Sequence, residues 1–169
     1  MTAHTMLLSL AVVEGIRLAE LIDQFTEVLT DSGSGSDPAI ERLTPIAYPE
    51  DADASADFAH ATREDLLDRR RTDAATMRHA LAPLLVTAPG DLADHEGIEE
   101  REIAIRPEDL DAWLRTLTSL RLVIATRLDI TADDDDHDPE DSRYGVYDWL
   151  GYRLDQLIAI ADDYDATNP

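Results

Sequence analysis

The chain has 169 residues, a formal net charge of −23 and no cysteine. The length fits one domain over residues 1–169, and an apolar fraction of 44% is enough to build a core. The acidic excess argues against nonspecific nucleic-acid binding, because phosphates would be repelled, and the missing cysteines exclude disulfides and thiolate chemistry.

An apolar run at residues 6–13 comes first along the chain. It is far shorter than the roughly 20 residues that span a bilayer, and no basic segment precedes it as in a signal peptide. Apolar residues continue at helical spacing to Leu29, so the pattern predicts a helix over residues 6–30 that starts buried. We expect a cytoplasmic protein that does not interact with membranes.

The middle of the chain is irregular. A Ser/Gly-rich segment at 31–38 predicts a flexible loop, and Pro45 and Pro49 prevent a long helix around them. Residues 52–60 are compatible with a short helix, and a longer one is predicted from Thr62, a suitable N-cap, to about Pro83. Residues 103–105 resemble a strand for which no pairing partner is evident.

Two helices are predicted in the last third. Pro107 followed by two acids is typical of a helix start, and the apolar stretch behind it predicts the central helix over residues 107–128. A last helix is predicted over residues 142–163. The expected fold is therefore an all-α helical bundle of four main helices, with short helical segments and acidic loops.

Three blocks of sequence follow one another in a recognisable order: RLTPIAYPED at 42–51, AWL followed by LRLV and TRL within 112–128, and YGVYDWL at 144–150. They resemble an actinobacterial family that is known only as a domain of unknown function. Thr118-Ser119 depart from the Asn-Asp of many members. The resemblance implies genes that often neighbour that of the Clp protease adaptor, and it supplies no catalytic residues.

The basic residues agree with such a source. All 14 are arginine, and 25 of the 37 acids are aspartate. Because lysine codons are rich in A and T, this usage indicates a GC-rich bacterial genome. Adaptation to high salt is a competing explanation, but it does not require the absence of lysine.

Residues 129–141 hold eight acids and one histidine, with a faint EF-hand spacing. The sixth loop position is Asp134, where the sharp turn needs glycine. We therefore interpret this segment as a flexible, solvated loop, and we predict no metal site and no cofactor. The EF-hand alternative would use ligands at Asp129, Thr131, Asp133, Asp135, His137 and Glu140.

Three arginines fall among apolar positions of predicted helices, and a buried guanidinium must find a partner. Asp148, between two aromatic residues, is the favoured partner of Arg121, which we expect to be mostly buried. The prediction is a structural polar network, with a ligand-binding site as the alternative. Its members are Arg70, Arg121, Arg127 and Asp148.

Aromatic residues are concentrated in the last helix, where their spacing covers two helix faces. Core packing explains one face, and the other is a candidate groove or dimer contact. The predicted binding residues are Tyr144, Tyr147, Trp149 and Tyr152.

No H-E-x-x-H, Walker or G-x-G-x-x-G motif occurs in the sequence. The leading hypothesis is a non-enzymatic protein-interaction or regulatory protein, which the resemblance links to Clp-dependent proteolysis. Its expected partner is another protein, or a second copy in a homo-oligomer. The alternatives are a small-molecule-binding or enzymatic helical bundle, and a transcriptional regulator, which would need a basic face that the sequence does not show.

Overall fold

A pair of antiparallel strands joins two distant parts of the chain in this computed structural model, which describes residues 5–31, 37–44, 48–86, 94–131, 137–138 and 140–167. Strand β1 (Met6–Ala11) pairs with β2 (Glu100–Ile105), with Met6 opposite Ile105. Met6, Leu8 and Leu10 are buried, while the intervening Leu7 is 51% exposed. This alternation is that of a strand with one buried face.

The predicted helix start at residue 6 and the predicted absence of a partner for residues 103–105 are therefore wrong. A short apolar run fits a strand and a buried helix turn equally well by periodicity. The pairing that decides between them comes from Met6 and Ile105, which lie far apart in the sequence. The helix begins only after the strand.

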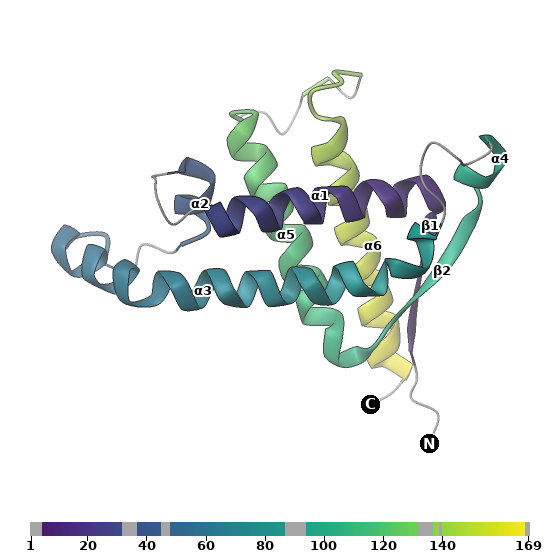
Figure 1. The fold of residues 1–169 in the computed structure, drawn as a ribbon, viewed down its shortest axis with the longest axis horizontal. Helices are drawn as coiled ribbons and strands as arrows, with labels where there is room; N and C mark the ends of the chain where they lie inside the picture. The colour runs from purple at the N-terminus through teal and green to yellow at the C-terminus, as the bar shows by residue number, and fades with distance from the viewer. Residues whose placement is uncertain are drawn as a thin grey trace.

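Four long helices make up most of the described chain: α1 (Val12–Asp31), α3 (Ala52–Ala80), α5 (Leu110–Arg127) and α6 (Gly145–Thr167) (Figure 1). Short elements link them: α2 (Pro38–Arg42), the 3₁₀ turn η1 (Ala82–Leu85), α4 (Asp94–Gly97) and the 3₁₀ turn η2 (Pro107–Asp109). The prediction of a mostly helical fold is confirmed, although the small sheet makes the all-α description approximate.

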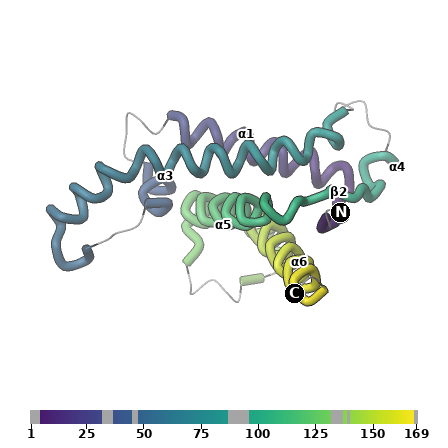
Figure 2. Tube along the Cα trace, turned by 90° about the horizontal axis from the view of Figure 1, so that it is seen from below, coloured from purple at the N-terminus to yellow at the C-terminus, as the bar shows by residue number. Residues whose placement is uncertain are grey.

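The long helices form two layers. Helices α1 and α3 run side by side, and α5 and α6 cross behind them (Figures 1 and 2). The fully buried Trp113 of α5 lies in the core, with Leu117, Leu150 and Leu157. The core is thus built by the apolar stripes of all four long helices together with the inner face of β1 and β2.

Helix α3 is longer than predicted and begins at Ala52, not at Thr62. The Asp51 carboxylate caps it by accepting a hydrogen bond from the Ala54 amide at 2.9 Å, and Thr62 instead donates to the Phe58 carbonyl within the helix at 2.8 Å. Buried side chains start only at Leu67. The first half of α3 therefore projects beyond the rest of the molecule (Figures 1 and 2).

Much of the two predicted flexible loops lies outside the described residues, at 32–36, 132–136 and 139. At the described end of the first one, Asp37 caps α2 by accepting from the Ala39 amide at 2.9 Å. In the part of the chain that the structure describes, no helix combines the length and apolarity that crossing a bilayer requires.

Candidate functional site

An open groove of about 420 Å³ lies between the first half of α1 and the start of α6. Val13, Val146 and Trp149 line it. The two valines have 45% and 44% of their surface exposed, and the Trp149 side chain is half-buried. The further lining residues are Glu14, Arg17, Glu20, Leu21, Gln24 and Gly145. The lining is thus mainly apolar, and its charged side chains come from α1.

A hydrogen-bonded cluster of Glu14, Trp149 and Arg153 borders this groove and ties three elements together. The Glu14 carboxylate accepts from Trp149 Nε1 at 2.8 Å and from the Ala11 amide at 3.1 Å. It also forms an ion pair with Arg153, whose side chain is only 9% exposed. We call these three residues the Glu14 cluster.

Arg153 extends the cluster to the strand. Its Nη1 donates to the Ser9 carbonyl at 3.2 Å and to Gln156 Oε1 at 2.6 Å. Because it joins β1, α1 and α6 through one guanidinium, Arg153 fixes the start of α1 against the middle of α6. Both walls of the groove are thereby held in place.

The charge state of Glu14 follows from these contacts. Burial raises the pKa of the Glu14 carboxyl, but the hydrogen bonds from Arg153, Trp149 and Ala11 and the Arg153 charge outweigh it, so the net pKa is lowered. A lowered pKa makes this carboxylate a weaker base, and both of its oxygens already accept hydrogen bonds from the protein.

Of the four predicted binding aromatics, Trp149 lines the groove, and the other three have separate surroundings. Tyr144 stacks on His137 with ring centroids 3.9 Å apart. Tyr147 lies under the Arg121 guanidinium. Tyr152 is 56% exposed, and its hydroxyl accepts from Gln156 Nε2 at 2.8 Å.

The predicted polar network is divided among different partners. Arg70 donates to Ser119 Oγ at 2.9 Å and to the Leu43 carbonyl at 2.6 Å, and burial lowers its pKa against the opposing charge of Asp73. Arg127 pairs with Asp37 at 2.6 Å, which connects the end of α5 to the cap of α2. These two arginines act as separate local braces.

The predicted Arg121–Asp148 ion pair is replaced by other contacts. Arg121 Cζ lies 4.0 Å from the centroid of the Tyr147 ring. Asp148 instead bonds to His137 Nε2 at 2.7 Å. Consecutive residues of a helix point about 100° apart, so Tyr147 and Asp148 cannot both face the same residue of α5. Arg121 is partly exposed, and its Nε is buried.

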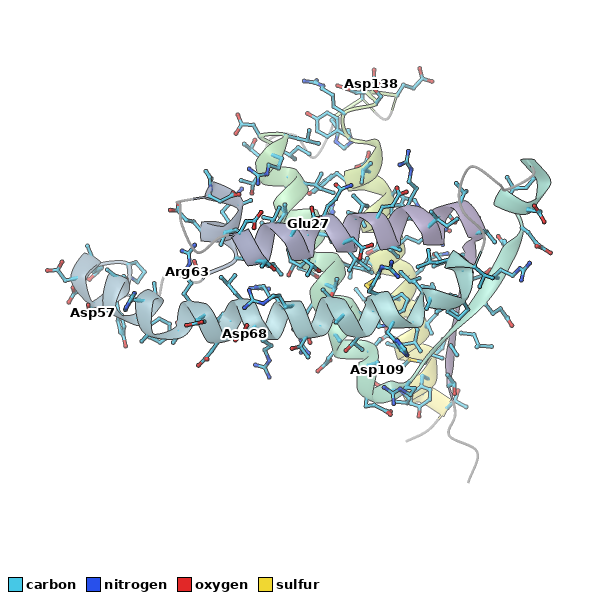
Figure 3. The ribbon with its side chains drawn as sticks, in the orientation of Figure 1. Glu27, Asp57, Arg63, Asp68, Asp109 and Asp138 are labelled. Carbon is cyan, nitrogen blue, oxygen red and sulfur yellow. The ribbon has the colours of Figure 1, made fainter. Side chains whose placement is uncertain are left out.

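Negative side chains are spread over the outer surface. Glu27 of α1, Asp57 and Asp68 of α3 and Asp138 before α6 come from distant parts of the chain (Figure 3). Among the described residues, no group of three or more histidines and acids is placed to hold a metal ion. Of the six EF-hand positions considered, Asp133 and Asp135 lie outside the described residues.

Sequence reasoning missed the Glu14 cluster. Neither Glu14 nor Arg153 is among the predicted site residues, although Trp149 is. One signal was available, because Leu150, Arg153 and Leu157 have the i, i+3, i+7 spacing of a buried stripe. An arginine on such a stripe needs an acid from another element.

Comparison with known families identifies the chain. The model of the family described as "Domain of unknown function (DUF2017)" matches residues 2–161, and the chain therefore belongs to this family. No curated protein and no solved structure matches the chain.

Proposed function

We propose that this DUF2017 protein is a non-enzymatic interaction or regulatory protein that binds a segment of a partner protein in the groove between α1 and α6. The observation that carries the proposal is the pair of exposed valines beside Trp149, between two helices fixed by the Glu14 cluster. Exposed apolar side chains in a groove with rigid walls are typical of a protein-binding surface.

The polar groups around the groove support an apolar docking mode. Arg17 pairs with Glu20 at 3.0 Å, and the Glu14 oxygens are occupied by protein donors. Gln24 and the remaining donors of Arg17 are the other polar groups at the groove. Apolar side chains of the partner would supply the binding energy, and the net charge of −23 would favour a partner with a basic surface through long-range attraction.

The proposal includes a link to Clp-dependent proteolysis in an actinobacterial host. This part rests on the gene neighbourhood that the family resemblance implies, which is an association and carries no geometry. It makes the Clp protease adaptor the first purified partner to test.

A small-molecule-binding role is the second candidate, because about 420 Å³ falls in the range of ligand pockets. The two candidates differ in what the groove must supply. A small ligand needs converging polar groups for specificity, whereas a protein segment can bind through apolar contacts and backbone shape.

The test uses two matched variants of α6. Val146→Asp places a charge in the groove, and Ile158→Asp places one at a site of nearly equal exposure, 43% against 44%, that does not line the groove. Binding of the purified Clp adaptor is measured by titration calorimetry with each variant, after circular dichroism has verified their folding. We expect Val146→Asp to weaken binding roughly tenfold or more, and Ile158→Asp to leave it unchanged.

The same variants, used as baits in an actinobacterial lysate, extend the test beyond the Clp adaptor. A protein captured by the parent and by Ile158→Asp, but lost with Val146→Asp, supports the interaction role. A metabolite that copurifies with the parent and is lost with Val146→Asp, without any captured protein, would establish the small-molecule role instead. Equal capture by all three baits would contradict a role for the groove.

A further inference from the structure

Three arginines of the described chain have a buried Nε without a hydrogen-bond partner: Arg70, Arg121 and Arg153. In two of them the terminal nitrogens are used. Arg70 bonds to Ser119 and to the Leu43 carbonyl, and Arg153 bonds to Glu14, Ser9 and Gln156. Arg121 differs, because the described residues offer no acceptor to any of its nitrogens and no carboxylate within ion-pair distance.

The surroundings of Arg121 fix its guanidinium without neutralising it. One face lies on the Tyr147 ring, with Cζ 4.0 Å from the ring centroid. The guanidinium also packs against Gly151, where an added Cβ would lie 3.3 Å from Nε and 3.4 Å from Nη2. Glycine at this position therefore lets the guanidinium lie flat between α5 and α6.

We propose that Arg121, held on Tyr147 beside Gly151, binds an oxyanion group, carboxylate or phosphate, of an incoming ligand. A guanidinium is planar and always charged, and its fork of N–H donors matches both groups. The ring contacts only one face of the guanidinium. Because Nε is buried, an incoming anion would bind at the terminal Nη1 and Nη2, which are not among the buried unpaired atoms.

The scarcity of internal partners supports this site in a chain with 37 acids. Nine other arginines in the described residues form ion pairs with acids, from Arg17 with Glu20 to Arg153 with Glu14. Asp148 follows Tyr147 directly on α6, but its carboxylate contacts His137 Nε2 at 2.7 Å. A half-buried cation without such a partner has more to gain from an external anion than a compensated one.

This site is distinct from the groove of the proposed function. Arg121 and Tyr147 meet where α5 packs on α6, whereas the groove lies where α1 faces α6. Neither Arg121 nor Tyr147 lines the groove. Binding at one site can therefore be tested with the other left intact.

The experiment follows the arginine Nε–Hε signals in ¹H–¹⁵N spectra of the full chain during titration with inorganic phosphate or with succinate. Sodium chloride at matched ionic strength is the control for screening. We expect a saturable shift of the Arg121 signal with one or both anions. Whichever anion saturates identifies the group that the site prefers.

Two variants keep the proposal falsifiable. Arg121→Lys retains the charge but loses the fork, and we expect roughly tenfold or more weaker binding; Arg69→Lys, at an exposed position of α3, should bind like the parent. Gly151→Ala crowds the guanidinium and should also weaken binding. Calorimetry measures the anion affinity of Arg121→Lys. An affinity equal to that of the parent would overturn the proposal. So would a shift of the parent Arg121 signal in sodium chloride that equals its shift in phosphate or succinate.

Discussion

The buried Arg153 of α6 and the half-buried Arg121 of α5 have opposite surroundings. Toward α1 and β1, Arg153 has an acid, a carbonyl and an amide oxygen as acceptors. Toward α5, Arg121 has an aromatic ring and a glycine, and no described acceptor. Both terminal nitrogens of Arg153 have acceptors and only its Nε lacks one, whereas the described residues give Arg121 no hydrogen-bond acceptor.

The difference indicates which side carries stability and which side is suited to a ligand. Removing one member of a buried ion pair leaves an uncompensated charge, so the Glu14 cluster should be costly to break. The Arg121 contact is a cation–π interaction, for which about 0.5–2 kcal/mol is typical. Four measurements test this comparison.

Arg153→Ala should cause the largest loss. It leaves the Glu14 carboxylate without its ion-pair partner, and we expect unfolding in urea to show a cost of about 3–5 kcal/mol. Arg17→Ala is the control, because its exposed pair with Glu20 should contribute less than about 1 kcal/mol.

Replacing Glu14 and Arg153 together by leucine completes this test. The double change should cost much less than the sum of the two single changes, because neither charge is then left unpaired. Additive losses would show that the two residues act independently.

Gly15→Ala tests how tightly the start of α1 is packed on the same side. A Cβ at Gly15 would overlap Cδ1 of Leu84, which is 6% exposed. We expect a cost of about 1–3 kcal/mol in thermal or urea unfolding. Gly145→Ala is the matched control, since nothing lies within 4 Å of its added Cβ. Equal stability of both variants would contradict the tight contact.

The Glu14 cluster should also make the stability of the fold depend on pH in the acidic range. The pKa of Glu14 lies below its usual value of 4.5 in the folded protein, so the unfolded state binds more protons in this range. The contribution of ionised Glu14 to the free energy of unfolding is complete above about pH 4.5, and it is lost as the pH falls through the folded pKa. The urea midpoint of the parent should fall more steeply below about pH 4.5 than that of Glu14→Gln. Parallel profiles would disprove the coupling.

Arg121→Ala should have the smallest effect on stability, about 1 kcal/mol, because an ion pair with Asp148 is absent and only the ring contact is lost. A double-mutant cycle with Asp148→Ala should give a coupling energy below about 0.5 kcal/mol. A loss of the size expected for Arg153→Ala would place Arg121 in a structural ion pair after all.

The long helices were predictable because their apolar stripes are periodic. Helix α5 begins and ends close to the predicted bounds of 107–128, and η1 with Pro83 follows the end of α3. Strand β1 was missed because its run is short and its partner β2 comes much later in the sequence. The start of α3 was missed because Thr62 and Asp51 are both good caps, and sequence alone does not rank them.

The candidate site was harder to predict. Trp149 was singled out, and it lines the groove, but its partner Glu14 is on a helix 135 residues away. The choice between Tyr147 and Asp148 as the contact of Arg121 depends on the rotation of α6 about its own axis. That rotation is set by how α6 packs against α5 and β1 together.

The sequence by itself determined that this is a mostly helical, strongly acidic chain with its core on amphipathic stripes, because periodicity and composition are local properties. Only the tertiary structure decided which arginine is paired. Arg121 and Arg153 are both arginines within apolar helices, and the sequence does not distinguish them. Packing places Glu14 against Arg153 and a tyrosine ring against Arg121, and a guanidinium acquires its partner only from such long-range neighbours.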